Sequence, residues 1–286
     1  MFDYAARRRH LSERMEAEGV AAIFLPLSAD LEYLTGVERQ IPFFGQSSYA
    51  HGWASGGLFV RGEDPVFVFP RMFVTFDLVE EPEGALVVVN ENDDGEALFA
   101  RAMSVIPRSG TVAVGDRIWG ETLLNLGHDV GFERLATGSH LVNDLRRVKD
   151  DDELAAMGRA ITCVEQTMAA VTPLVQPGIS MGELAEAVDA EMRRAGSRCP
   201  SFTTHMFTNF GPDELDSGLS TARTPIPEGT SVMFDFGGVV DGYCSDFGRT
   251  IYCGDPPQEV RDVYEVMPPP TQRDSPQQPR ARRPAR

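Results

Sequence analysis

The sequence predicts an α/β domain followed by a second, α+β domain in which two helices precede a β-rich region. Three patterns predict it: apolar runs that alternate with helical patterns up to about residue 140, a long helix with an acidic start, and an Asp-Gly turn between two apolar segments. The length of 286 residues suits about two domains of ordinary globular composition. We therefore expect domains at residues 1–141 and 142–267 and a tail at 268–286.

Short apolar runs predict the strands of the first domain, because runs of this length are typical of buried strands. These strands are expected at Val20–Pro26, Gly57–Arg61, Pro65–Pro70, Ala85–Val89 and Thr111–Gly115. Helical patterns are found before and between them, at Tyr4–Glu18, Gly95–Val105 and Trp119–Leu126. Strands that alternate with helices in this way indicate an α/β sheet.

Two helices open the second domain. The first begins at the acidic run 150–153, whose charges favour the positive end of a helix dipole, and we expect it to continue to about Val171. Ser180 and Glu183 are three residues apart in a capping-box pattern. They predict the start of a second amphipathic helix that ends near Arg194.

The segment Val232–Tyr252 is interpreted as a β-hairpin with Asp241-Gly242 at its turn, because this dipeptide tolerates the positive φ angles of tight turns. With these two residues at the centre of the turn, Asp235 pairs with Gly248. Asp246 then lies diagonal to Asp235 on the same face of the hairpin. A β-bulge would instead bring the two aspartates directly opposite each other.

Asp235 and Asp246 are the candidate metal-ligating residues. Both have apolar or aromatic neighbours, where a buried carboxylate is costly unless it is paired, protonated or bound to a cation. Divalent metals suit carboxylate ligands, and two metals about 3.5 to 4 Å apart activate water in hydrolytic enzymes. The alternative that the spacing leaves open is structural: the aspartates bond to the backbone or pair with Arg249.

Composition excludes several function classes. The formal net charge of −17 disfavours a nucleic-acid partner or an anionic membrane surface. No apolar run approaches the length of about 18 residues that a membrane span needs, and no signal-peptide pattern follows the N-terminal arginines. The four cysteines form no CxxC pair, which argues against a zinc ribbon or a disulfide framework. We expect a cytoplasmic protein.

The string DFGGVVDGYCSDFGRT, residues 235–250, resembles the first metal-ligand segment of the creatinase, prolidase and aminopeptidase P family, the pita-bread metallohydrolases. Two more segments match in the same order. Ala29–Gly36 resembles an early loop of the family's N-terminal domain, and Leu145–Glu153 resembles the entry into its first long helix. The resemblance covers about residues 1–266.

The resemblance implies an α/β creatinase-type domain followed by a partial α+β pita-bread domain. It also implies a metal-dependent hydrolase of the Xaa-Pro aminopeptidase or prolidase type. In the family, two Asp, one His and two Glu hold two divalent ions, such as Mn, Co or Zn. By match, Asp235 and Asp246 are the two Asp ligands, with Asp246 bridging. A metal-activated water would cleave an amide bond in a small peptide substrate, and a homodimer is a possible assembly.

The end of the sequence departs from the family pattern. The family's His and two Glu ligands follow the hairpin at some distance, whereas residues 268–286 are rich in proline and arginine. We expect this tail to be disordered. We interpret it as the result of a frameshift or truncation near Met267, with a proline-rich interaction arm as the alternative.

A second departure concerns a histidine. Many peptidases of the family have a substrate-facing His before the first Asp ligand, and the equivalent stretch, Asp216–Ser220, has none. His205 is the only His nearby and is the candidate catalytic residue, with a structural role as the alternative. Two other functions stay open: a creatinase-like C–N hydrolase, against which the paired acids argue, and a non-catalytic partner-binding or remnant protein of the same fold.

Overall fold

The structure is a computed structural model that describes residues 2–39, 49–211, 214–216 and 223–266. The chain divides into two compact units. Unit 1 comprises residues 1–157 and 241–243, and unit 2 comprises residues 158–240 and 244–286. The division falls inside a long helix, and the domain boundary expected after residue 141 stays a prediction.

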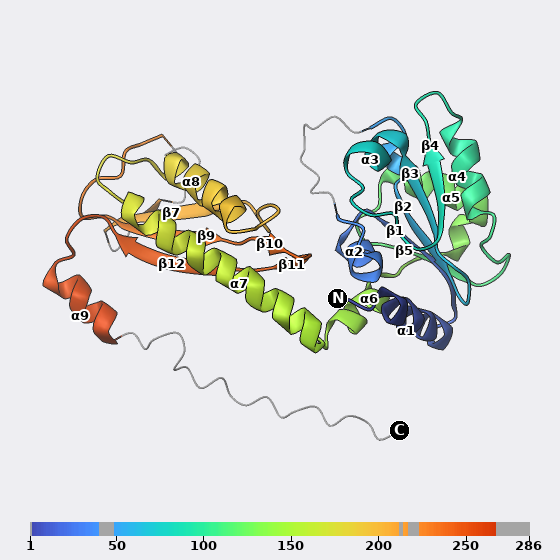
Figure 1. Ribbon diagram of the computed structural model, residues 1–286, viewed down its shortest axis with the longest axis horizontal. Helices are drawn as coiled ribbons and strands as arrows, with labels where there is room; N and C mark the ends of the chain where they lie inside the picture. Colours follow the sequence, from blue (N-terminus) through green and yellow to red (C-terminus); the bar gives the residue numbers. More distant parts are fainter. Residues whose placement is uncertain (1, 40–48, 212–213, 217–222, 267–286) are drawn as a thin grey trace, which may run out of the picture. The chain divides into compact units, whose positions relative to one another are not determined.

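Six strands form a mixed sheet in unit 1, in the order β4-β3-β2-β1-β5-β6 (Figure 1). They are Val20–Pro26 (β1), Gly56–Val60 (β2), Val66–Pro70 (β3), Ala85–Val89 (β4), Thr111–Val114 (β5) and Leu135–Thr137 (β6). Strand β1 runs antiparallel to β2 and parallel to β5. The five expected strands are confirmed. Strand β6 was missed because it has only three residues, none of them buried.

Helices cover both faces of this sheet (Figure 1). They are Tyr4–Ala17 (α1), Ala29–Thr35 (α2), Arg71–Phe76 (α3), Gly95–Met103 (α4), Gly120–Val130 (α5) and Ser139–Arg146 (α6). Alternate residues of β1 reach opposite cores. Ile23 and Leu25 pack with residues of α1, α2, α3 and α6, whereas Ala22 and Phe24 pack with residues of α4 and α5. Unit 1 is therefore a three-layer α/β/α domain.

Unit 2 has a four-stranded sheet in the order β12-β9-β7-β8 and a short pair of strands, β10 and β11. The strands are His205–Gly211 (β7), Glu214–Asp216 (β8), Ser231–Phe236 (β9), Val239–Val240 (β10), Tyr243–Cys244 (β11) and Phe247–Tyr252 (β12). The helices are Asp151–Val171 (α7), of which the start belongs to unit 1, Met181–Arg194 (α8) and Gln258–Val266 (α9). The two helices expected from sequence, α7 and α8, are present.

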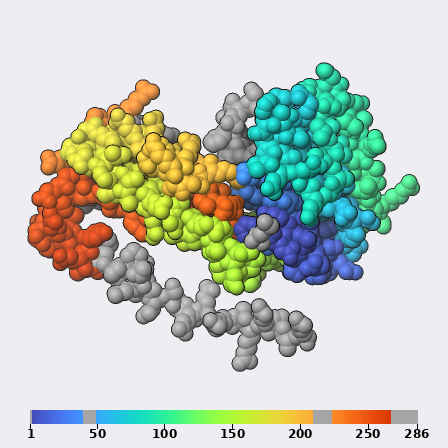
Figure 2. Space-filling view, in the orientation of Figure 1, coloured from blue at the N-terminus to red at the C-terminus, as the bar shows by residue number. Residues whose placement is uncertain are grey.

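Helices α7 and α8 cover one face of the unit 2 sheet. Val164 of α7 and Val188 of α8 share a core with Phe234 and Phe236 of β9. Figure 2 shows the two helices, yellow-green and yellow, packed side by side. The expected capping box holds the start of α8, because Ser180 and Glu183 each bond to the other's backbone. This packing leaves the other residues of β9 on the opposite face.

The turn of the predicted hairpin has the expected conformation. Asp241 and Gly242 have φ angles of 50° and 79°, both positive, as a type I′ turn requires. These residues and Tyr243 belong to unit 1. The two long strands of the hairpin, β9 and β12, belong to unit 2.

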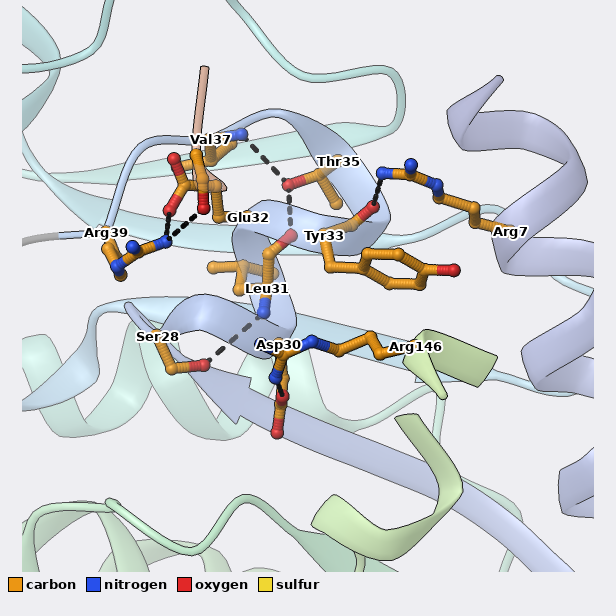
Figure 3. Close-up of polar contacts among 11 residues, drawn as sticks. Arg7, Ser28, Asp30, Leu31, Glu32, Tyr33, Thr35, Val37, Arg39 and Arg146 are labelled. Carbon is orange, nitrogen blue, oxygen red and sulfur yellow. Dashed lines mark hydrogen bonds and ion pairs between the residues drawn. The ribbon is translucent and has the colours of Figure 1, made fainter. Parts of the chain in front are cut away.

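Salt bridges and capping bonds surround α2 in unit 1 (Figure 3). Arg146 forms an ion pair with Asp30 at 3.0 Å, and Arg39 forms one with Glu32. Arg39 also donates a hydrogen bond to the carbonyl oxygen of Gly242 at 3.1 Å. The segment that resembles the family's early loop is thus a short helix whose acidic side chains are paired with arginines.

Among the residues that the structure describes, no helix combines the length and the apolar character that crossing a membrane requires. No disulfide joins the four cysteines, all of which the structure describes. Cys163 and Cys253 are buried, whereas Cys244 is exposed. The tail 268–286 and the stretch 217–220, where the sequence lacks the expected histidine, lie outside the described residues.

Candidate metal centre

Asp235 lies on β9 and faces away from the helices. Val232, Phe234 and Phe236 of the same strand are buried in the core beneath α7 and α8, and Asp235 alternates with them at intermediate exposure. Asp235 keeps this partial exposure although its neighbours in sequence are aromatic, because successive side chains of a strand point to opposite faces. Its carboxylate therefore lies on the face of the sheet that α7 and α8 do not cover.

Asp246 precedes β12, and the predicted register is confirmed. Phe236 pairs with Phe247 and Asp235 with Gly248. Nearer the turn, the backbone N–H of Ser245 donates to the carbonyl oxygen of Gly238 at 2.9 Å, in the same register. No bulge therefore brings the two aspartates directly opposite, and Asp246 is diagonal to Asp235. Asp246 is exposed.

His205 begins β7 and pairs directly with Asp235 of β9. Directly opposite residues of an antiparallel pair project from the same face, with Cβ atoms about 4.5 to 5.5 Å apart. His205 is exposed. The sheet therefore brings together two candidate residues that are thirty positions apart in sequence, one from each of two neighbouring strands.

The structural alternative that paired the aspartates with Arg249 is wrong. Arg249 pairs in register with Phe234, so it projects from the face opposite to Asp235. Its guanidinium lies 4.1 Å from the ring centroid of Phe247 and donates to the carbonyl oxygen of Gly248. Within the described ranges, no ion pair joins it to either aspartate.

The donor atoms of Asp235, Asp246 and His205 suit a divalent metal. Carboxylate oxygens and an imidazole nitrogen are ligands that Mn, Co and Zn accept. Among the described residues, however, no group of three or more His, Cys, Asp or Glu side chains converges closely enough to hold a metal ion. Asp235 and Asp246 therefore fit a part of a metal coordination sphere.

The turn of the hairpin is held by buried polar groups of unit 1. The hydroxyl of Tyr243 donates to Glu153 Oε1 at 2.7 Å and accepts from Arg7 Nη2 at 3.2 Å. Burial, and then the hydrogen bond to Glu153, raise the pKa of this hydroxyl. The Arg7 guanidinium also lies 4.0 Å from the ring centroid of Tyr33. Sequence reasoning missed this group, because the residues are far apart in the chain.

Glu153 has a second role at the start of α7. Its backbone N–H donates to Asp150 Oδ1 at 2.8 Å, and its Oε2 accepts from the backbone N–H of Asp150 at 2.9 Å. This is a reciprocal capping box. The sequence predicts only that the charges of the acidic run 150–153 favour the helix dipole. In the structure, Glu153 is 2% exposed and bonds to Asp150 and Tyr243.

Comparisons with known proteins agree with this architecture. A model of metallopeptidase family M24 matches residues 155–268, and a model of the creatinase/prolidase N-terminal domain matches residues 7–148. A putative dipeptidase of Bacillus subtilis, YkvY, is 24% identical over 265 residues, which are 91% of this chain and 69% of that protein. An Xaa-Pro dipeptidase of Pyrococcus furiosus is 21% identical over 261 residues, 91% of this chain and 68% of that protein.

Solved structures show the same fold. The prolidase of Thermococcus sibiricus has a TM-score of 0.75 at 22% identity, over 93% of this chain and 70% of that one. The dipeptidase PepE of Mycobacterium ulcerans has a TM-score of 0.66 at 23% identity, over 92% and 69%. The chain thus spans about two thirds of the length of these proteins. The expected fold class, a creatinase-type domain followed by pita-bread architecture, is confirmed.

Proposed function

We propose that the protein is a metal-dependent hydrolase of the Xaa-Pro dipeptidase or aminopeptidase type, because models of metallopeptidase family M24 and of the creatinase/prolidase N-terminal domain match residues 155–268 and 7–148. Relatives named as Xaa-Pro dipeptidases and peptidases support this activity. The observation that carries the proposal is that Asp235, His205 and Asp246 share the face of the unit 2 sheet that α7 and α8 do not cover.

Asp235 and Asp246 would be among the ligands that hold divalent ions of Mn, Co or Zn. A pair of such ions, when bound, lowers the pKa of a water and polarises the amide carbonyl oxygen. The two carboxylates supply negative charge that balances the ions. His205 lies opposite Asp235, where its ring nitrogen can donate a hydrogen bond to the substrate. The other face of the unit 2 sheet packs against α7 and α8 in the hydrophobic core.

The metal requirement tests this function. The full-length protein, purified without chelator, is expected to contain Mn, Co or Zn in near-stoichiometric amount and to hydrolyse an Xaa-Pro dipeptide. Removal of metal with a chelator should abolish turnover, and one of the three ions should restore it. The measurements are elemental analysis and proline release. A protein that contains no metal and releases no proline in the presence of all three ions would contradict the proposal.

The alternative function is that of a non-catalytic partner-binding or remnant protein of the same fold. The same experiment separates the two functions, because a non-catalytic protein would contain no metal and would have no turnover. Creatine, added as a second substrate, tests the creatinase-like alternative.

Replacement of His205 by glutamine tests its catalytic role. We expect kcat for the Xaa-Pro dipeptide to fall by about 100-fold, because a positioned imidazole contributes about this much to proton transfer or hydrogen bonding in a transition state. His140→Gln, which changes an exposed histidine of unit 1, is the matched control. A kcat in His205→Gln that equals that of the control would assign His205 a structural role only.

We place the protein in the cytoplasm and expect a small peptide or amide substrate, without a nucleic-acid partner. The net charge of −17 supports the partner class, and the four cysteines, which form no disulfide, support the location. A homodimer is the assembly that we expect. Analytical ultracentrifugation would distinguish it from a monomer.

A further inference from the structure

A group of three serines surrounds the point where the hairpin strands are interrupted between β9 and β10 and between β11 and β12. We call Ser197, Ser201 and Ser245 the serine cluster. All three lie in unit 2, and Ser245 directly precedes Asp246. The interruption consists of Gly237 and Gly238 on one strand and of Ser245 and Asp246 on the other.

Ser245 is buried, and its side chain and backbone both bond to Gly238. The backbone N–H of Gly238 donates to Ser245 Oγ at 3.0 Å, and the Ser245 hydroxyl lies 3.3 Å from the Gly238 carbonyl oxygen, to which it can donate. The backbone N–H of Ser245 donates to the same oxygen at 2.9 Å. Ser245 is only 6% exposed, so no water replaces these bonds readily.

The segment that contains Ser197 and Ser201 bonds to the carbonyl oxygen of Ser245 and to the strand that faces it. The Ser201 hydroxyl donates to the carbonyl oxygen of Ser245 at 2.9 Å, and the Ser201 backbone N–H donates to the carbonyl oxygen of Gly237 at 2.8 Å. Ser197 Oγ accepts from the backbone N–H of Val239 at 2.9 Å. The peptide group that links Ser245 to Asp246 is thus fixed by its carbonyl oxygen.

Gly237 allows this close approach. A Cβ atom at this position would overlap the carbonyl oxygen of Ser245 and the hydroxyl of Ser201. The glycine therefore allows the two strands to approach each other closely. Gly237 follows Asp235 by two residues, and Ser245, which it approaches, directly precedes Asp246. Both candidate ligands are therefore close in sequence to this contact between the strands.

We propose that Ser245 is a positioning residue, which fixes the backbone of Asp246 and so holds its carboxylate relative to Asp235 for metal binding. This inference rests on the proposed function. The Ser245 hydroxyl does not need to contact the metal or the substrate for this role. Groups that orient metal ligands in this way typically change metal affinity by about 10- to 100-fold when they are removed.

The test compares Ser245→Ala with Ser231→Ala, a serine of β9 outside the serine cluster, in the full-length protein. We expect the affinity for Mn²⁺, measured by titration calorimetry, to fall about tenfold in Ser245→Ala and to stay unchanged in the control. Amide hydrogen exchange at Gly238 and Ser245 in the metal-free protein should accelerate by about tenfold in the same variant only.

Four results would overturn the inference. Unchanged exchange at Gly238 and Ser245 shows that the hydroxyl does not fix this backbone, and faster exchange with unchanged Mn²⁺ affinity shows that the fixed backbone does not serve the metal. If Asp246→Asn loses Mn²⁺ while Ser245→Ala keeps it, the proposed function stands and this inference alone fails. A wild-type protein that binds no Mn²⁺, Co²⁺ or Zn²⁺ overturns both.

Ser201→Ala provides a second variant if Ser245→Ala does not fold. It removes a single hydrogen bond from the carbonyl oxygen of Ser245 at a half-buried position. We expect a loss of Mn²⁺ affinity of about threefold, with a melting temperature close to that of the wild type. Unchanged affinity in a folded Ser201→Ala protein counts against the inference.

Discussion

Asp246→Asn is expected to abolish hydrolysis of an Xaa-Pro dipeptide by the full-length protein, with a loss of at least about 1,000-fold in kcat/KM. Asparagine has nearly the same shape as aspartate, and Asp246 is exposed, so the fold should be unaffected. The variant would lack one of the two negative charges that we propose to hold the metal. Steady-state kinetics and elemental analysis together measure the effect.

Asp241→Asn is the matched control, because it makes the same chemical change in the same hairpin. Asp241 has a φ angle of 50°, which asparagine also tolerates, so the turn should form as before. We expect turnover and metal content within about twofold of the wild type for this variant. If Asp246→Asn behaves like the control, the assignment of Asp246 as a metal ligand is wrong.

Arg7→Ala is expected to destabilise unit 1 by about 3 to 5 kcal/mol, because it leaves the carboxylate of Glu153 without its cation inside the protein. The two side chains are 7% and 3% exposed, and Arg7 Nη2 lies 3.7 Å from Glu153 Oε1. Arg7 also donates to the carbonyl oxygen of Tyr33 at 2.9 Å. Thermal denaturation should show a melting temperature about 10 °C lower.

Arg9→Ala tests whether this loss depends on burial. Arg9 lies on the same helix, α1, and is exposed, so we expect a change within about 0.5 kcal/mol. The double variant Arg7→Met with Glu153→Gln removes both charges and should recover much of the stability, because no unpaired charge stays buried. A loss in Arg7→Ala no greater than in Arg9→Ala would show that the buried pair contributes little.

Local patterns predicted most of the elements and the register of the hairpin that carries Asp235 and Asp246. The turn at Asp241-Gly242 and the register of Asp235 with Gly248 depend on residues close in sequence, and both are confirmed. The capping box at Ser180 is local as well. Such features are readable because turn and cap chemistry depends on a few neighbouring residues.

Contacts between distant segments were not predictable in the same way. The pairing of β7 with β9 places His205 opposite Asp235, but nothing in either strand's own sequence specifies this neighbour. The exposure of Asp235 also depends on which face α7 and α8 cover. Only the complete sheet with its helices determines which polar residues of the strands stay accessible.

The bond between Tyr243 and Glu153 has a consequence for the order of folding during synthesis. The two residues are 90 positions apart, and Arg7 is 236 positions from Tyr243. At a translation rate of about 5 to 20 residues per second, Tyr243 is made about 5 to 18 seconds after Glu153. For these seconds Arg7 and Glu153 face water where the tyrosine will later lie. The hydrogen bonds of Tyr243 with Glu153 and Arg7 in unit 1 therefore form only after Tyr243 has left the ribosome.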